Sequence, residues 1–209
     1  MTVNIAFIDS GNAFGNNTDV FPGENIIIKK IDQYEIESYD FSEFDVIIVP
    51  NFADQENLYM HKNVIENFLS KGRIVVFFGH LFRPWLRGAS LFMPEKINHF
   101  SDYNLYPEED SEIFNGVLTE DMTFNKGVAG FFARGYYLAD EKSEVHLKFK
   151  SGHICAYADR HSSKGTIFIH AGRPLHGYYK DGKTTDRLRS QFIQWLHNEA
   201  KALKGESAE

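Results

Sequence analysis

Two unbroken apolar runs constrain the fold of this chain more than any other feature of its sequence. They are FDVIIVP (44–50) and RIVVFFG (73–79), and both are typical of strands that are covered on two faces. Between them, residues 53–72 repeat apolar side chains at helical spacing; Asp54 can cap the start of this helix, and Gly72 follows its end. Strand, helix and strand with short links predict a βαβ unit, and therefore parallel strands with a right-handed crossover.

The rest of the chain adds strands and a closing helix. The helix is predicted over 184–203, where Thr184 or Thr185 can act as the cap. Weak periodicity between 81 and 143 predicts loops and short helices that cover the ends of the sheet. A tight turn at 151–152 makes part of the sheet antiparallel. Further strands are predicted at 3–9, 25–31, 144–150, 153–159 and 165–172.

Together these elements predict one α/β domain over residues 1–209. We expect a flavodoxin-like sandwich: a mostly parallel sheet with helices on both faces and a small antiparallel extension. A chain of 209 residues is long enough to bury a sizeable core.

Charge and cysteine content narrow the possible partners and the location. The formal net charge of −7 argues against non-specific binding to nucleic acid, which needs a dense positive field. The single cysteine, Cys155, permits no internal disulfide and no multi-cysteine metal site. The N-terminus lacks the pattern of a signal peptide, and no apolar run approaches the roughly 20 residues that span a bilayer. We therefore expect a cytoplasmic protein without a membrane partner.

Four stretches of the sequence carry a resemblance to a known group of proteins. They are FSEFDVIIVPN (41–51), VIENFLSKGRIVVFFGH (64–80), HSSKGTIFIHAG (161–172) and RLRSQFIQWL (187–196). Their order and patterns resemble the class I glutamine amidotransferase-like superfamily, and in particular its ThuA-like branch. The resemblance implies the class I amidotransferase-like version of the sandwich described above.

The sequence departs from that family where the amidotransferase chemistry takes place. The family pattern places a nucleophilic cysteine in the turn after the elbow strand, and this chain has GHLFR there, with His80 or Leu81 in the cysteine's place. After the later strand, His170 is kept, but Gly172 stands in the place of the family's glutamate. A glutaminase with a Cys-His-Glu triad is therefore not expected. ThuA-like members also lack the cysteine and often carry a histidine near this point, and their activities are mostly unassigned and loosely linked to sugar metabolism.

Ligands of open α/β sheets bind outside the carboxyl ends of the strands, and this rule gathers polar residues that are distant in the sequence. A guanidinium suits a carboxylate or phosphate, although each arginine could instead pair with acidic residues such as those of PEED (107–110). We expect a small polar ligand, anionic or sugar-like, and Trp85, Tyr178 and Tyr179 could either stack on a sugar ring or pack internally. The predicted ligand-binding residues are Asp9, Ser10, Asn12, Asn51, Arg83, Arg173 and His176.

Two histidines are candidate catalytic residues. His80 and His170 could act as general base and acid, because imidazole titrates near neutral pH. They could also bind a metal with His176 or Asp9 as a third ligand, or simply hydrogen-bond to the backbone. The glycine- and asparagine-rich segment at 10–17 is not a nucleotide fingerprint. No cofactor and no resident metal are predicted.

Three functional hypotheses follow. The first is a binding domain for a small polar or anionic molecule, with no or weak catalysis. The second is a hydrolase or lyase that uses His80 or His170 with a bound water or metal. The third is an assembly module that buries an aromatic patch from the 81–143 region against a partner or a second copy, so a homo-oligomer is possible.

Overall fold

An eight-stranded sheet forms the centre of the computed structural model, which describes residues 1–12 and 25–205. The strand order is β2-β1-β3-β4-β12-β11-β10-β6; the strands from β2 to β12 are parallel, and the last three run antiparallel to their neighbours. The predicted parallel sheet with its antiparallel extension is thus confirmed. The strands are β1 (Val3–Asp9), β2 (Ile26–Asp32), β3 (Val46–Val49), β4 (Ile74–Phe78), β6 (Leu105–Pro107), β10 (Glu144–Phe149), β11 (Ile154–Asp159) and β12 (Thr166–His170).

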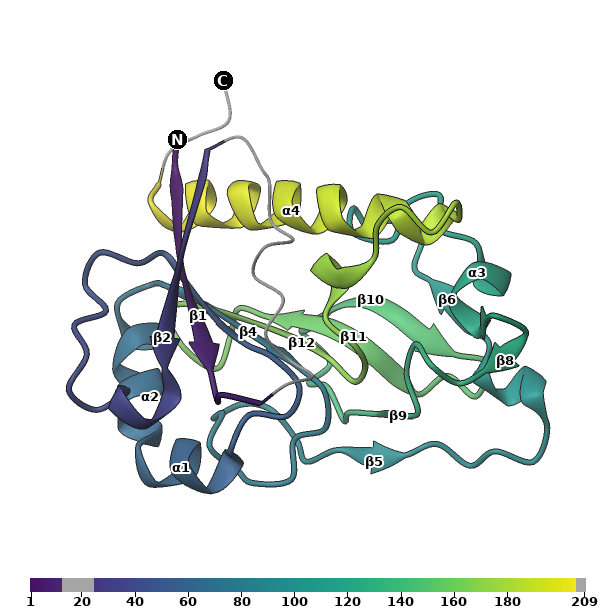
Figure 1. Ribbon diagram of the computed structural model, residues 1–209, viewed down its shortest axis with the longest axis horizontal. Helices are drawn as coiled ribbons and strands as arrows, with labels where there is room; N and C mark the ends of the chain where they lie inside the picture. Colours follow the sequence, from purple (N-terminus) through teal and green to yellow (C-terminus); the bar gives the residue numbers. More distant parts are fainter. Residues whose placement is uncertain (13–24, 206–209) are drawn as a thin grey trace.

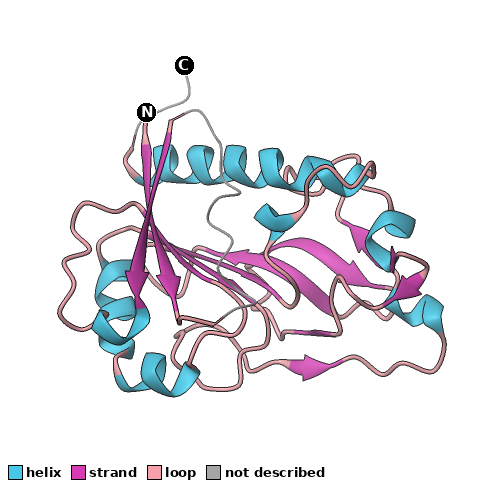
Figure 2. Ribbon diagram, viewed as in Figure 1, coloured by secondary structure: helices cyan, strands magenta, loops and turns pink. Residues whose placement is uncertain are grey.

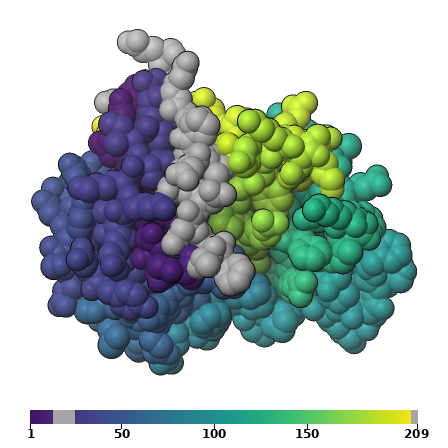
Figure 3. All heavy atoms as spheres, viewed as in Figure 1, coloured from purple at the N-terminus to yellow at the C-terminus, as the bar shows by residue number. Residues whose placement is uncertain are grey.

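Helices cover both faces of the sheet, as predicted. The long helix α4 (Arg187–Leu203) lies along one face, and α1 (Gln55–Met60) and α2 (Lys62–Ser70) lie on the other side (Figures 1 and 2). In the space-filling view, the N-terminal strands and helices (purple and blue) pack on one side, and α4 with the segment before it (yellow to yellow-green) packs on the other (Figure 3). No helix in the described residues is long and apolar enough to cross a membrane.

The segment between β4 and β10 is irregular, as its weak periodicity indicated. Short elements connect it to the ends of the central sheet (Figure 1). They are β5 (Met93–Pro94), which pairs with β9 (Gly135–Tyr136), the hairpin of β7 (Phe124–Asn125) and β8 (Val128–Ala129), and α3 (Thr119–Thr123). The 3-10 turns of the chain are Gln33–Glu35, Phe100–Tyr103, Leu175–Gly177 and Thr184–Asp186.

Three local predictions can be compared with the structure. The Asp54 cap is confirmed, because its carboxylate accepts from the backbone N–H groups of Glu56 and Asn57. The single helix predicted over 53–72 is instead two helices, because the backbone leaves the helical conformation at His61 (φ −106°, ψ 23°). The predicted threonine cap of α4 is wrong: the Thr184 hydroxyl donates to Asp121, 2.5 Å away. The predicted glycine- and asparagine-rich loop at 10–17 is described only as far as residue 12.

Aromatic side chains hold α4 on the sheet. The ring of Phe168 on β12 lies 5.4 Å from that of Phe192 and 5.1 Å from that of Trp195, measured between centroids, and Phe78 on β4 lies 5.6 Å from Phe192. All four side chains are buried. Offset and edge-to-face aromatic pairs add to the free energy gained by burying apolar area. This cluster fixes α4 over β4 and β12. Both strands end at the site described below.

Phe168→Ala is expected to lower the free energy of unfolding by about 3–5 kcal/mol, because it opens a cavity at the centre of this cluster. Urea denaturation measures the loss. Phe100→Ala is the matched control, since Phe100 is 53% exposed, and should change stability by no more than about 0.5 kcal/mol. Equal effects of the two variants would contradict the assignment of Phe168 to the core.

Candidate functional site

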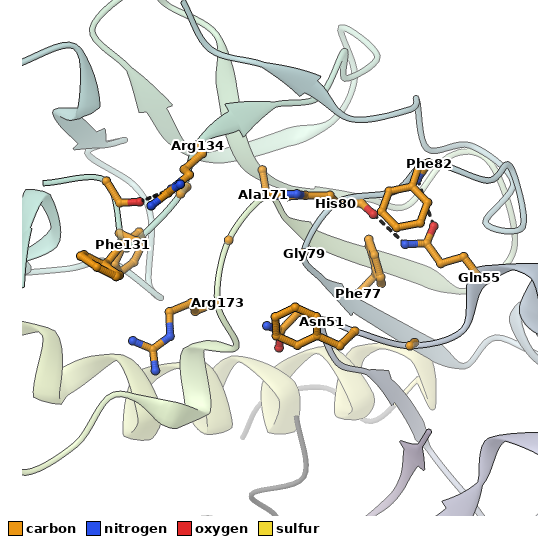
Figure 4. A pocket seen from close by; sticks show the side chains of 16 residues that line it. Asn51, Gln55, Phe77, Gly79, His80, Phe82, Phe131, Arg134, Ala171 and Arg173 are labelled. Carbon is orange, nitrogen blue, oxygen red and sulfur yellow. Dashed lines mark hydrogen bonds between the residues drawn. The ribbon is translucent and has the colours of Figure 1, made fainter. Parts of the chain in front are cut away.

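A cavity of about 510 Å³ lies at the carboxyl ends of β3, β4 and β12, where the strand-end rule predicts a ligand site. Its volume is in the range of small-molecule pockets, and its wall is mostly apolar. Figure 4 shows the side chains that line it. They are Asn51, Phe52, Ala53, Gln55, Phe77, Gly79, His80, Phe82, Gly130, Phe131, Phe132, Ala133, Arg134, Ala171, Gly172 and Arg173.

The turn after β4, residues 79–83, forms the floor of the cavity, and two side chains hold its backbone. The buried Tyr137 hydroxyl donates to the Gly79 carbonyl (2.5 Å) and accepts from the N–H of Leu81 (3.1 Å). The Gln55 amide donates to the His80 carbonyl (2.7 Å), and its oxygen accepts from the next two N–H groups, of Phe82 and Arg83 (3.0 and 3.3 Å). These bonds satisfy peptide groups that no strand or helix pairs.

Two glycines are required where the cavity floor meets its neighbours. Gly79 has φ +114°, and a β-carbon there would lie 3.0 Å from the β-carbon of Asn51. At Gly172, a β-carbon would lie 2.0 Å from the Phe132 carbonyl oxygen. No side chain of any kind therefore fits at Gly172 without moving the backbone of residue 132.

The arrangement does not provide the parts of an amidotransferase active site. Cys155 is fully buried on β11 and does not line the cavity, and burial raises the pKa of its thiol. The N–H groups of Leu81, Phe82 and Arg83 are all engaged by side chains, so they are not free to stabilise an oxyanion. With Gly172 lacking a carboxylate, neither the nucleophile nor its orienting partners stand in the cavity.

Three predicted residues do line the cavity: Asn51 after β3, His80 after β4 and Arg173 after β12. Within the described part of the chain, none of these three side chains has a hydrogen-bond or carboxylate partner, so their polar atoms are available to a ligand. The His80 ring stacks on Phe92 at 3.9 Å. Partial burial, with a contribution from the Arg134 charge, lowers the pKa of His80. This shift favours the neutral imidazole, which has one N–H donor and one acceptor nitrogen.

Arg134 lines the cavity and was not predicted from the sequence. It belongs to the irregular segment, where no periodicity or motif singles it out. Ala133 bridges to Gly172, and the N–H of Arg173 donates to the Phe132 carbonyl at 3.3 Å, so this segment runs beside the residues that follow β12. The Arg134 Nε donates to the Gly130 carbonyl (2.9 Å), and its terminal nitrogens have no hydrogen-bond partner among the residues that the structure describes.

Two of the predicted residues after β1 bond to the backbone of Phe52, a residue that lines the cavity. The Ser10 hydroxyl and the Asn12 amide both donate to the carbonyl of Phe52, at 3.2 and 3.3 Å. Phe52 has φ +70°, a conformation that is costly for a bulky residue, and these bonds help to hold it there. Asp9 accepts from the Gly11 N–H at 2.8 Å, as a turn residue does. None of Asp9, Ser10 and Asn12 lines the cavity.

The structure buries the other two predicted histidines in the core. His170 lies among phenylalanine rings, its Nδ1 bonded to the Arg173 carbonyl at 3.1 Å, and burial lowers its pKa to about 3. His176 lies against Phe7 and Phe78, and burial, with a contribution from the Arg189 charge, lowers its pKa to about 3. Neither lines the cavity, so His80 and His170 do not form an acid–base pair there. The described residues contain no group of three or more His, Cys, Asp or Glu that could hold a metal ion.

Arg83 forms an ion pair, as one of the alternatives predicted, but its partner is Glu56 and not a residue of the PEED segment. Its Nε lies 2.6 Å from Glu56, and its Nη2 donates to the same carboxylate at 2.7 Å. The residue from the PEED segment, Glu108, pairs with Lys148 instead. Trp85 packs inside the core against Phe77, so it cannot stack on a ligand.

Comparison with known proteins identifies the fold. No protein-family model and no curated protein matches this chain by sequence. A cytoplasmic protein of Salmonella typhimurium aligns over 94% of this chain and 99% of its own, with a TM-score of 0.63 and 10% identity. A GMP synthase-like protein of Thermoplasma acidophilum aligns over 98% of both chains, with a TM-score of 0.62 and 12% identity.

A glutamine amidotransferase of Thermotoga maritima aligns over 99% of this chain and 95% of its own, with a TM-score of 0.53 and 13% identity. The likeness to these structures concerns the fold. The chain therefore has the α/β fold of glutamine amidotransferase-like structures, as the resemblance implied.

Tyr137→Phe is expected to lower the free energy of unfolding by about 1–3 kcal/mol, because it leaves the Gly79 carbonyl and the Leu81 N–H without their buried partner. Urea denaturation measures the loss. Tyr157→Phe is the matched control, since its buried hydroxyl has no hydrogen-bond partner among the described residues, and it should cost no more than about 0.5 kcal/mol. Equal losses would show that Tyr137 does not hold the turn through its hydroxyl.

The buried His170 makes stability depend on pH. Its folded-state pKa of about 3 lies below the ordinary value of 6.5, so between these values the unfolded chain binds a proton that the folded chain excludes. The free energy of unfolding therefore falls as pH decreases through this window, by at most about 1.4 kcal/mol per pH unit from this residue. His170→Asn should give a shallower slope in denaturation series between about pH 7 and about pH 4.5. Parallel slopes for variant and wild type would contradict a buried neutral His170.

Proposed function

We propose that the protein is a binding domain that holds a small anionic molecule in this cavity, without glutaminase chemistry. One observation carries the proposal. The chain has 29 acidic and 22 basic residues, yet the described residues lining the cavity include Arg134, Arg173 and His80 and no acidic residue. An acidic protein that excludes its own carboxylates from a cavity and places two guanidinium groups there has a site suited to an anion.

The surroundings strengthen this electrostatic preference. The mostly apolar wall lowers the local dielectric constant, and in that setting a hydrogen bond between a guanidinium and a carboxylate or phosphate is stronger than it is in bulk water. Arg173 has no ion-pair partner within the described part of the chain, so a ligand would not have to displace one. Asn51 and His80 offer neutral hydrogen-bonding groups on other parts of the wall, which would orient the ligand.

Binding is favoured over hydrolysis because the cavity lacks a second titratable partner. A hydrolase or lyase that used both histidines would need them at one reacting centre, and only His80 lines the cavity. The N–H groups of Leu81, Phe82 and Arg83 are engaged by Tyr137 and Gln55, so these three are not free to stabilise a developing negative charge.

Within the shared fold, we place the chain with ThuA-like proteins. His80 in the turn after β4 and the missing elbow cysteine support this placement. We also propose that the protein works in the cytoplasm. Its single buried cysteine is consistent with a reducing compartment, and a similar structure is described as a cytoplasmic protein.

Arg173→Ala is expected to weaken binding of an anion such as inorganic phosphate by about tenfold or more, because it removes charge-assisted hydrogen bonds. A thermal-shift titration, followed by calorimetry, measures the change; a ligand at about a hundred times its dissociation constant adds about 2.7 kcal/mol of stability. Arg87→Ala is the control, since Arg87 is exposed and lies outside the cavity. Equal affinities of the Arg173→Ala variant and wild type, or equal losses in both variants, would contradict the proposed site.

A further inference from the structure

The geometry points to a ligand in which a flat apolar ring is joined to the anionic group. This inference rests on the proposed function and adds the chemical class of the ligand. Five phenylalanine rings line the cavity. Two of them, Phe77 and Phe132, are buried and serve the core, whereas the other three face the cavity and solvent.

The three rings at the cavity mouth are exposed to an unusual extent. Phe52 is 64% exposed, Phe82 is 64% exposed and Phe131 is 45% exposed. Scattered exposed apolar side chains are normal, but three phenylalanines that converge on one cavity make an apolar patch of the kind that marks a binding site. They come from three different segments: the turn after β3, the turn after β4 and the segment before β9.

One of these rings is held in place at a cost in backbone conformation. Phe52 has φ +70°, which for a phenylalanine costs on the order of 1–3 kcal/mol. Its carbonyl receives hydrogen bonds from Ser10 and Asn12, and the backbone of Asp54 next to this turn is bonded on both sides by the buried Gln33.

One of the three exposed rings, Phe131, lies on the same wall as the positive charges. Figure 4 shows Arg134, Phe131 and Arg173 on the same side of the cavity, opposite Phe77 and Gln55. The Arg134 guanidinium lies 6.0 Å from the centre of the Phe131 ring. A ligand whose anionic group met the arginines would therefore place its remaining atoms among the phenylalanine faces, where a flat ring stacks best.

The wall favours an apolar ring over a sugar ring. Sugar hydroxyls need many hydrogen-bonding partners, and unpaired polar groups in a cavity are costly. Of the two side-chain amides in the wall, Gln55 accepts from two N–H groups of the turn and donates to the His80 carbonyl, and the described lining holds no carboxylate to accept from hydroxyl groups. The inferred ligand is thus a ring-bearing carboxylate or phosphate, with an aromatic or similarly flat apolar ring.

A calorimetric comparison of ring and charge tests the inference. The probes are phenyl phosphate and phenylacetate (ring and charge), inorganic phosphate and acetate (charge without ring), benzyl alcohol (ring without charge) and glucose 6-phosphate (sugar ring and charge). We expect the first pair to bind about tenfold or more tighter than the matched anions that lack a ring, and tighter than glucose 6-phosphate. Benzyl alcohol should bind more weakly than either aromatic anion.

The outcomes separate the two proposals. If phosphate and acetate bind as tightly as their aromatic counterparts, or if glucose 6-phosphate binds more tightly than phenyl phosphate, the inference fails and the anion site stands. If no anion binds, or if benzyl alcohol binds as tightly as the aromatic anions, the proposed anion function itself fails. In that case, the exposed rings would instead be candidates for contact with a protein partner.

Two variants test whether these rings cause the preference for a ring-bearing anion. Phe131→Ala and Phe52→Gly should each lower the affinity for phenyl phosphate by a larger factor than the affinity for phosphate, and so remove part of the preference for the ring. Phe52→Gly also relieves the positive φ, so it should retain or raise the melting temperature, and a weakened ligand preference could not be attributed to unfolding. Phe100→Ala, an exposed phenylalanine outside the cavity, is the matched control. An unchanged ring preference in both variants would overturn the inference.

Discussion

The backbone of the turn after β4 is the constraint on which the rest of the site depends. Residues 79–83 leave the sheet at its carboxyl edge: the Gly79 N–H still donates to the His170 carbonyl on β12, but the N–H groups of residues 81–83 have no strand to pair with. Gln55 at the start of α1 and Tyr137 next to β9 supply the missing partners through their side chains. The two side chains come from segments on either side of β4 in sequence, so satisfying one turn also fixes α1 and the irregular segment against the sheet. The cavity is the space that remains between these three parts.

The same arrangement explains how an acidic protein concentrates positive charge. Arg173 follows β12 directly, and the bridge between Ala133 and Gly172 runs the 130–134 segment alongside it, which brings Arg134 to the same wall. Gly172 makes this close approach possible, because any side chain there would collide with the Phe132 carbonyl. This backbone contact is therefore what brings the second arginine to the cavity.

The fold shared with glutamine amidotransferase-like structures does not by itself imply their reaction. The parallel sheet and its helices follow from apolar patterns that many sequences satisfy, whereas the chemistry depends on a few residues in the turns at the strand ends. In this chain those turns hold His80 and Arg173, and the segment before β9 adds Arg134 and Phe131. The cavity keeps the position of an α/β active site and has a wall suited to holding a ligand.

The sequence by itself determined the sheet, its helices and the edge at which a site would lie, because apolar period and strand–helix order are local properties. It also pointed to three residues that line the cavity, Asn51, His80 and Arg173, because each lies just after a buried strand. It could not place Arg134 or Phe131, which reach the cavity only through long-range pairing with the residues after β12. It could not show that His170 and His176 point into the core, since a strand end leaves the direction of a side chain open until its neighbours pack. Nor could it show that Arg83 forms an ion pair with Glu56. Tertiary structure decided these points because pairing, burial and direction depend on contacts between segments that are far apart in the chain.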